Sequence, residues 1–251
     1  MRGLTGERWF KTRISKIAFA GRCAIPGCRN STMGAAGAGL AAFHCRKHVE
    51  HKARHGSHWH GTYSAAELKP YLAAATSYVR PRAESDRFIK AALSAIALLL
   101  EEAGPTEIAT RLRGMSPRRR ARIALARLRV AGVKPERFVA IVLAITALIE
   151  EDPGSHRTKE FRTVQIAKAL HRLASGYHRV WELPDERGRL RKVSELHAFP
   201  RSSGQVLRIM GRAVEEHCEW VVEKHLPGVL ALKKKRYGQH PRCAAAAVPV
   251  R

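Results

Sequence analysis

Apolar residues recur at helical spacing through most of the chain from Ser64 onward. Ser64 and Glu67 form a capping box that starts the first of these helices, and Pro70 is expected to kink that helix or restart it. A last long helix is expected over 205–225, with Cys218 on its buried side. Stripes bounded by Pro, Ser, Thr and Gly predict the helices in between, at 84–103, 106–114, 117–131, 135–151 and 158–175. The pattern therefore predicts a mainly α fold.

Over residues 177–196 the pattern changes from helical spacing to strand-like alternation. Strand-prone residues flank the turn residues 184–188, which predicts one β-hairpin. A basic hairpin of this kind could form the wing of a helix-turn-helix built from the helices at 135–151 and 158–175. The alternative is a plain hairpin that covers the edge of a helical bundle.

The charge of the chain points to a class of partner. Among 251 residues there are 46 Lys and Arg against 21 Asp and Glu, a formal net charge of +25. Such an excess repels itself in the folded state, and it is usual where the partner is a polyanion, most commonly nucleic acid. A solvated basic surface is the alternative. We expect nucleic acid as the partner, with DNA foremost.

Cysteine usage and hydropathy bear on the compartment. Five cysteines, unevenly spread, argue against the disulfide framework of a secreted protein and favour metal-bound thiolates in a reducing compartment. Residues 1–22 are basic and lack the apolar run of a signal peptide. The most apolar segments, 89–100 and 139–149, are shorter than a bilayer span. We therefore expect a cytoplasmic protein with no membrane partner.

Two close-spaced ligand pairs carry the most specific chemistry in the sequence. Cys23 and Cys28 form a C-x4-C pair around a Pro–Gly turn, and Cys45 and His48 form a C-x2-H pair at the start of an expected helix, 44–55. Two such pairs separated by a short loop match a tetrahedral structural zinc site. A turn with two ligands followed by a helix with two more is the layout of a treble-clef zinc module.

These residues, CAIPGC followed by HCRKHVEHKARHG, resemble a short zinc-binding segment of bacterial and phage DNA-associated proteins, some of them HNH-type endonucleases. The resemblance covers about residues 22–60 only. It implies that Cys23, Cys28, Cys45 and His48 bind zinc. His44 stands where that segment usually has a small or apolar residue.

The surplus histidines leave an enzymatic alternative open. They are His44, His51, His55, His58 and His60. A divergent HNH-like, metal-dependent nuclease would use His51, His55 and His58, yet the segment offers a catalytic metal few carboxylates, because Glu50 is the only acid between Cys23 and His60. The alternative is that these histidines are surface residues that become cationic near phosphates. Without P-loop, nucleophile-elbow or HExxH motifs, we expect no catalytic residues and read the zinc as structural.

Basic positions on three elements are expected to contact phosphates. The helix from Pro117 crowds six arginines, up to Arg127 and Arg129, into a short stretch with an apolar opposite face. The expected nucleic-acid-binding residues are Arg46, Lys47, Lys52 and Arg54, then Arg118, Arg119, Arg120 and Arg122, then Arg189, Arg191 and Lys192 of the hairpin.

The expected organisation has four parts: a basic arm at 1–22, a zinc-binding module at 23–62, an α-helical domain with the hairpin at 63–226, and a basic, disordered tail at 227–251 that includes the Lys233–Arg236 run and Cys243. The function predicted is a zinc-stabilised, nucleic-acid-binding protein of regulatory, mobile-element or phage type. The alternatives are the nuclease and a basic adaptor in a protein assembly. The oligomeric state is left open.

Overall fold

The computed structural model describes residues 21–32, 43–107, 112, 114–174, 176–198, 202 and 204–242, with the backbone alone for 176–181 and 194–198. The chain divides into two units, Met1–Gly61 and Thr62–Arg251. Among the described residues, the first unit contains one helix, α2 (Arg46–His55). The other described helices and the hairpin lie in the second unit. Most of the basic arm, the loop at 33–42, Cys243 and much of the helix expected at 106–114 lie outside the described residues.

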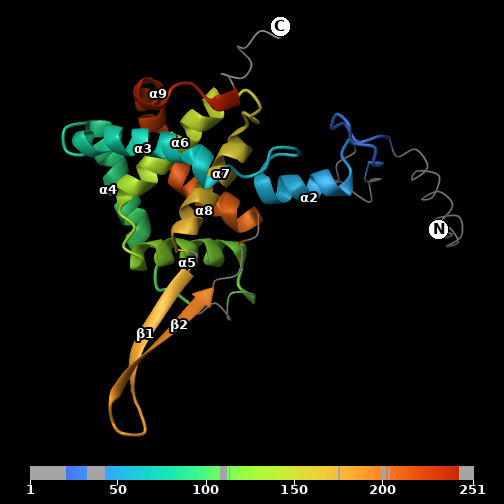
Figure 1. The fold of residues 1–251 in the computed structure, drawn as a ribbon. Helices are drawn as coiled ribbons and strands as arrows, with labels where there is room; N and C mark the ends of the chain where they lie inside the picture. Colours follow the sequence, from blue (N-terminus) through green and yellow to red (C-terminus); the bar gives the residue numbers. More distant parts are fainter. Residues whose placement is uncertain are drawn as a thin grey trace, which may run out of the picture. The chain divides into compact units, whose positions relative to one another are not determined.

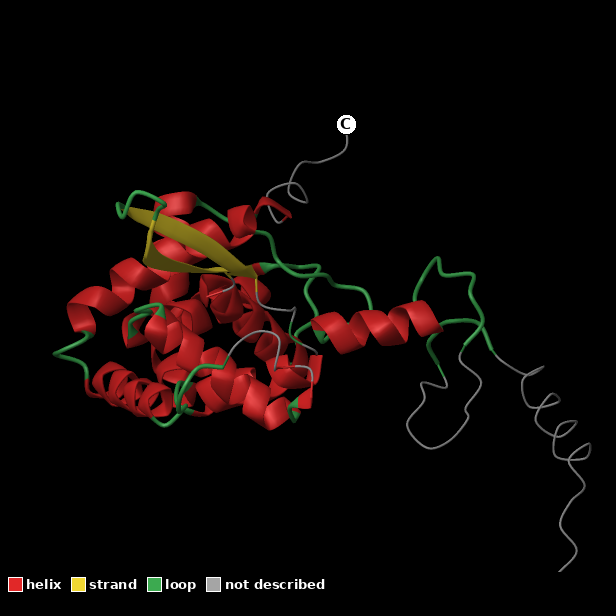
Figure 2. Ribbon diagram, turned by 90° about the horizontal axis from the view of Figure 1, so that it is seen from below, coloured by secondary structure: helices red, strands yellow, loops and turns green. Residues whose placement is uncertain are grey.

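The second unit is a bundle of helices around α6 (Pro135–Glu151), labelled in Figure 1. Figure 2, coloured by secondary structure, shows these helices together with the hairpin. Every residue of α6 from Phe138 to Ile149 is buried. Its neighbours include α3, α4, α7 and α9. The bounds are α3 (Ala65–Val79), α4 (Arg87–Glu101), α5 (Pro117–Val130), α7 (Lys159–His171), α8 (Gly204–Glu216) and α9 (Glu219–Tyr237). The prediction of a mainly α fold with one hairpin is confirmed in the described residues.

The helix starts agree with the sequence signals, but Pro70 does not break α3. Ser64 and Glu67 form the capping box, and the Ser116 hydroxyl accepts the hydrogen bond of the Arg119 N–H at the start of α5. Pro70 lies inside α3, which runs unbroken from Ala65 to Val79, so the expected restart there is wrong. Because the face that includes Tyr71 packs against α6 and α9, tertiary burial outweighs the lost backbone hydrogen bond.

The hairpin is the one sheet among the described residues. β1 (Gly176–Pro184) pairs with β2 (Leu190–Ala198) antiparallel, with Glu182 opposite Lys192 and Pro184 opposite Leu190. Its turn is closed by Gly188 N–H to the Asp185 carbonyl at 2.9 Å, and Gly188 takes a φ of 72°, which favours glycine. Figure 1 shows the hairpin leaving the helical body beside α5.

The expected winged helix-turn-helix does not fit the position of α6. A helix of such a pair needs an outer face for the nucleic acid, but α6 is enclosed from Phe138 to Ile149. The far part of the hairpin, residues 182–192, is exposed and covers no edge of the bundle. The hairpin is a projecting arm.

The C-terminal part differs most from expectation. The single helix expected over 205–225 is two helices, α8 and α9, separated at Cys218, which is buried as expected. The tail expected from residue 227 is wrong for its first part, since α9 continues through Pro227 to Tyr237. Lys233 is buried and donates to the Glu151 carboxylate, which also accepts the hydroxyl hydrogen of Tyr71.

Further along, Arg242 donates to the buried carboxylate of Asp152 at 3.1 Å, so the chain remains tied to the bundle beyond α9. Tyr63 donates to the same carboxylate from the other end of the second unit. No helix in the described ranges combines the length and the apolar character that crossing a bilayer requires.

Candidate metal centre

The first ligand pair lies in a short backbone turn. Cys28 N–H donates to the Ile25 carbonyl at 3.0 Å, and Gly27 takes a φ of 76°. A proline followed by a glycine at positive φ is the arrangement of a type II turn, as the Pro–Gly pair predicts. Cys23 N–H donates to the Asn30 carbonyl at 3.0 Å, which closes the two arms of the turn. Both cysteine side chains therefore start from one tight loop.

The second pair stands at the beginning of α2. Cys45 is the N-cap residue of this helix, and His48 follows three positions later, so both side chains lie over its first turn. The Phe43 carbonyl accepts the N–H of Ala24 at 2.8 Å, which ties the segment before α2 to the turn of the first pair. This backbone contact brings the two pairs together.

The four ligand atoms converge. All of them lie within 4.8 Å of one another, and this is the one such group of His, Cys, Asp and Glu among the described residues. The Sγ atoms of Cys28 and Cys45 are 3.9 Å apart, and the Nδ1 atom of His48 is 3.2 Å from Cys23 Sγ and 3.3 Å from Cys45 Sγ. Two thiolates on one tetrahedral zinc ion would lie about 3.8 Å apart. The four residues can therefore bind a metal ion, with His48 binding through Nδ1.

Local hydrogen bonds favour the thiolate at Cys45. Burial opposes its ionisation, but hydrogen bonds from the His48 backbone, the Asn30 side chain and the neighbouring thiols lower the pKa of Cys45 to about 6. At Cys28 the Asn30 backbone lowers the pKa, but burial and the nearby thiols of Cys45 and Cys23 raise it overall. A metal ion binds the thiolate form and displaces the protons of the remaining thiols, so a thiolate already favoured at Cys45 assists binding.

Four of the five surplus histidines form stacked pairs instead of a second ligand group. The rings of His44 and His58 stack at 3.6 Å between centroids, and those of His51 and His55 at 4.4 Å. His51 Nδ1 also lies 2.8 Å from the Ser57 carbonyl, which folds the chain back along α2. The histidines proposed for a nuclease site thus do not join a metal-type group among the described residues.

The basic residues of α2 surround a single acid. Glu50 accepts from Arg46 at 2.9 Å and lies 3.9 Å from Arg54, both as exposed pairs that contribute little to stability. Lys47 is exposed, and Lys52 is half-buried in the last turn. The four cations expected to contact phosphates therefore lie on one helix, and the ligand cluster holds the start of that helix.

The arginines of α5 divide into two groups. Arg127 is buried and donates to the Ala174 carbonyl, while Arg129 donates to the carbonyls of Leu100, Glu101 and Gly104 at the end of α4. Both guanidinium groups donate to backbone carbonyls. Arg127 is buried, so the phosphate contact expected of it is wrong, whereas Arg129 is half-buried.

The other four arginines lie nearer the surface, at the start of α5. Arg119 pairs with Glu107 at 2.9 Å, and Arg122 donates to the Glu102 carbonyl. Arg118 is exposed and Arg120 is half-buried. Arg118, Arg119 and Arg122 line an open hollow of about 420 Å³. Arg118, Arg119 and Arg122 are therefore accessible to a ligand, whereas Arg127 is buried.

The hairpin presents its cations at the far end of the arm. Arg189, Arg191 and Lys192 are exposed, as is Arg187 in the turn. The Asp185 carboxylate accepts the N–H groups of Arg187 and Arg189 at 2.9 and 2.8 Å, so this acid is used to shape the turn.

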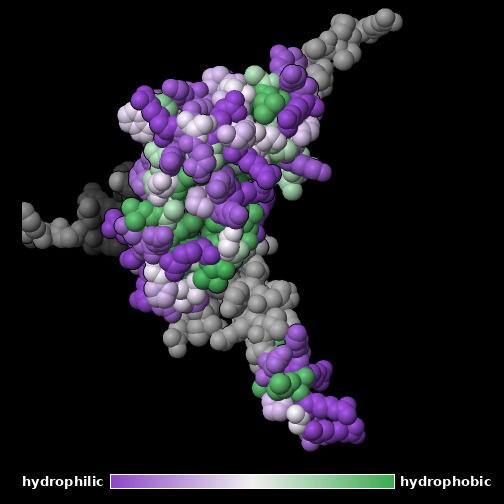
Figure 3. Space-filling model, turned by 90° about the vertical axis from the view of Figure 1, so that its left-hand side faces the viewer, coloured by the Kyte–Doolittle hydropathy of each residue, from purple (hydrophilic) through white to green (hydrophobic). Residues whose placement is uncertain are grey.

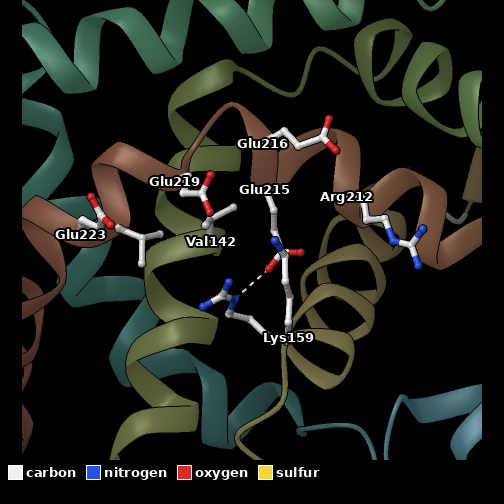
Figure 4. Close-up of a pocket in the computed structure, with 9 residues that line it drawn as sticks. Val142, Lys159, Arg212, Glu215, Glu216, Glu219 and Glu223 are labelled. Atoms are coloured by element: carbon white, nitrogen blue, oxygen red, sulfur yellow. Dashed lines mark hydrogen bonds and ion pairs between the residues drawn. The ribbon is translucent and has the colours of Figure 1, made fainter.

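A hollow of about 370 Å³ where α7, α8 and α9 meet is lined by four glutamates and three cations, Lys159, Arg162 and Arg212. Figure 4 shows its lining, in which Glu216, Glu219 and Glu223 join Glu215. The Glu215 carboxylate is held by Arg162 at 2.7 Å and by the Thr163 hydroxyl. The glutamates do not converge as metal ligands. This hollow is acidic and lies apart from the ligand cluster in the sequence.

Two features of the candidate sites were not assigned from the sequence. Asn30 donates to Cys45 Sγ at 3.8 Å and supports the ligand cluster, although no spacing rule identifies it. Leu183 and Leu190 are exposed at the end of the arm, 49% and 67% respectively, and the alternation of the strands conceals this because it predicts one covered face. Comparisons with protein-family models, curated proteins and solved structures find no match for this chain.

Proposed function

We propose that this protein binds nucleic acid, DNA foremost, and that a zinc ion stabilises its N-terminal module. The observation that carries the proposal is the position of the ligand cluster at the start of α2. The last two ligands, Cys45 and His48, lie on the first turn of a helix that carries four Lys or Arg residues and one acid. The metal would thereby fix a basic helix in a unit with few large apolar residues.

Zinc is the metal that best suits this donor set. Three thiol sulfurs and one imidazole nitrogen are soft or borderline ligands, which favour zinc over magnesium or calcium. Four protein ligands complete a tetrahedral shell, so the ion would hold the fold and would keep no open position for a substrate. A turn bearing two ligands and a helix bearing the others support the treble-clef arrangement.

The three basic surfaces would contact the phosphate backbone. They are the α2 cations, the α5 group of Arg118, Arg119, Arg120 and Arg122, and the arm residues Arg189, Arg191 and Lys192. Contacts of this kind supply affinity that falls with salt and carries no base sequence by itself. The affinity of the protein for nucleic acid should therefore decrease as the ionic strength rises.

The test is binding of a fluorescent 30-base-pair duplex, followed by anisotropy over a salt series. The affinity should fall steeply as salt rises, and Arg191→Ala with Lys192→Ala should reduce the slope of log affinity against log salt by about 2. Lys90→Ala is the matched control, since Lys90 is an exposed cation of α4 paired with Glu84. The control should leave the slope unchanged.

Other outcomes would replace the proposal. Absence of binding at low salt, or binding without a salt slope, contradicts it. Metal-dependent nicking of plasmid that is lost in His55→Ala would favour the nuclease. A protein partner retained after nuclease treatment would favour the adaptor.

A further inference from the structure

The far end of the hairpin arm exposes apolar side chains among arginines. Leu183 and Leu190 are 49% and 67% exposed, and Leu190 lies opposite Pro184 in the strand register. Figure 3 shows this end as apolar atoms surrounded by strongly hydrophilic ones, well away from the helical body. Because burying exposed leucine side chains away from water is favourable, this end has a strong tendency to enter an apolar environment.

The shape of the arm suits insertion. Strands of nine residues extend roughly 30 Å at about 3.3 Å per residue, and residues 182–192 are exposed. The turn is already ordered, because Asp185 accepts two backbone N–H groups and Gly188 takes the conformation that the turn requires. Little conformational entropy remains to be lost when this end binds.

The charges at the end of the arm indicate which kind of partner binds there. Arg187, Arg189, Arg191 and Lys192 outnumber the three acids of residues 182–192. Of those acids, Asp185 accepts hydrogen bonds from the turn backbone, Glu182 is the cross-strand neighbour of Lys192, and Glu186 is exposed in the turn. A second copy of a chain with a net charge of +25 would bring like charges together. Duplex DNA could bind both kinds of side chain. Its phosphates would pair with the arginines, and the faces of its base pairs would bury the leucines.

We propose that the end of the arm enters the minor groove of duplex DNA, where Leu190 on one face of the hairpin and Leu183 on the other press against the base pairs and Arg187, Arg189 and Arg191 contact the flanking phosphates. This inference rests on the proposed function and specifies its binding mode. Two strands about 4.8 Å apart, with their side chains, are too wide for a minor groove of about 6 Å. The groove must open, and partial unstacking at the leucine wedge bends the duplex toward the major groove.

The test measures bending and affinity on the same duplex, labelled at its two ends with a donor and an acceptor fluorophore. The full-length protein should increase energy transfer between the ends. The double variant Leu183→Ala/Leu190→Ala should lose that increase and bind about tenfold more weakly, equivalent to about 1.4 kcal/mol. Leu98→Ala, an exposed leucine of α4, is the matched control and should bend DNA as the wild type does. Thermal unfolding of each variant verifies folding.

The outcomes separate this inference from the function on which it rests. Binding of duplex without a change in energy transfer, or bending that the double variant retains, overturns the wedge and leaves nucleic-acid binding intact. Binding of single strands but not duplex has the same consequence. Failure to bind any nucleic acid removes the proposed function as well. A shift from oligomer to monomer in the double variant, measured by sedimentation without DNA, would assign the leucines to a second copy.

Discussion

Cys45 combines two roles that are usually separate in a small module. It is the N-cap residue of α2, and its sulfur is one of the four converging ligand atoms. Its sulfur lies 3.9 Å from Cys28 Sγ and 3.3 Å from His48 Nδ1, so it is directed at the other ligands. Loss of this one sulfur would therefore break the cluster while the helix sequence remains intact.

We predict that Cys45→Ser lowers the zinc content of the purified protein from about one ion per chain to well below half, since three protein ligands hold a structural zinc much more weakly than four. Elemental analysis measures this, and loss of ordered signals from residues 21–61 in a two-dimensional NMR spectrum measures its effect on folding. Cys218→Ala removes a buried thiol outside the cluster and should leave the zinc content unchanged. Equal zinc in Cys45→Ser and wild type would refute the assignment.

The burial of His171 makes the free energy of unfolding depend on pH. Burial, with the positive charge of Arg127 nearby, lowers the pKa of His171 from 6.5 to about 4. Its Nε2 atom lies 2.8 Å from the Ser202 hydroxyl. The folded state therefore keeps this imidazole neutral at a pH where the unfolded chain protonates it.

As the pH falls from about 6.5 to about 4, the unfolded state binds a proton that the folded state does not, so the free energy of unfolding should decrease. The gap between the two pKa values corresponds to roughly 3 kcal/mol when fully expressed. His171→Gln should remove most of this contribution, as urea unfolding at a series of pH values would show. The same slope in the variant and the wild type would mean that other groups cause it.

At the scale of elements, α5 supports its neighbour as well as presenting charge. Helix ends leave carbonyl groups without partners, and Arg129 donates to two of them, Leu100 and Glu101 at the end of α4, and to the Gly104 carbonyl just beyond it. Arg118 stands at the start of the same helix and is exposed. Arg129 thus stabilises the fold, whereas Arg118 is available to a ligand.

Arg129→Ala is expected to reduce the free energy of unfolding by about 2 kcal/mol, because it leaves half-buried carbonyls without donors. Arg118→Ala should change it by less than about 0.5 kcal/mol and should instead weaken nucleic-acid binding. Chemical denaturation and anisotropy, run on both variants, compare the two effects. A destabilisation by Arg118→Ala as large as that by Arg129→Ala would show that the division is wrong.

At the scale of the whole molecule, α9 closes the helical bundle. Its buried positions are Val221, His225, Val229 and Lys233, which repeat every four residues along one stripe. His225 lies 3.2 Å from Asp86, the N-cap of α4, and Lys233 donates to Glu151 at the end of α6. The last helix thereby links segments that are far apart in the sequence.

Lys233 and Lys235 test this role as a matched pair from one basic run. Lys233→Ala should reduce the free energy of unfolding by about 3 kcal/mol, since it leaves the Glu151 carboxylate without its cation. Lys235→Ala, at an exposed position, should have an effect of less than about 0.5 kcal/mol. Equal thermal midpoints in the two variants would argue against a closing role for α9.

Local chemistry was sufficient for much of the fold. The caps at Ser64 and Ser116, the turn at 184–188 and the spacing of the four ligands depend on neighbours a few residues away, so the sequence by itself determined them. The hairpin register follows from the same turn.

Tertiary packing decided the rest. Pro70 and Pro227 remain within helices because burial against the bundle offsets the lost hydrogen bond at each. The buried stripe of α9 does not stand out in the hydrophobic pattern, because His225 and Lys233 occupy two of its positions. The polar groups of these residues are paired only once other helices pack against α9. Burial of a charged residue depends on what packs beside it, and that is set by the three-dimensional arrangement rather than by spacing along the chain.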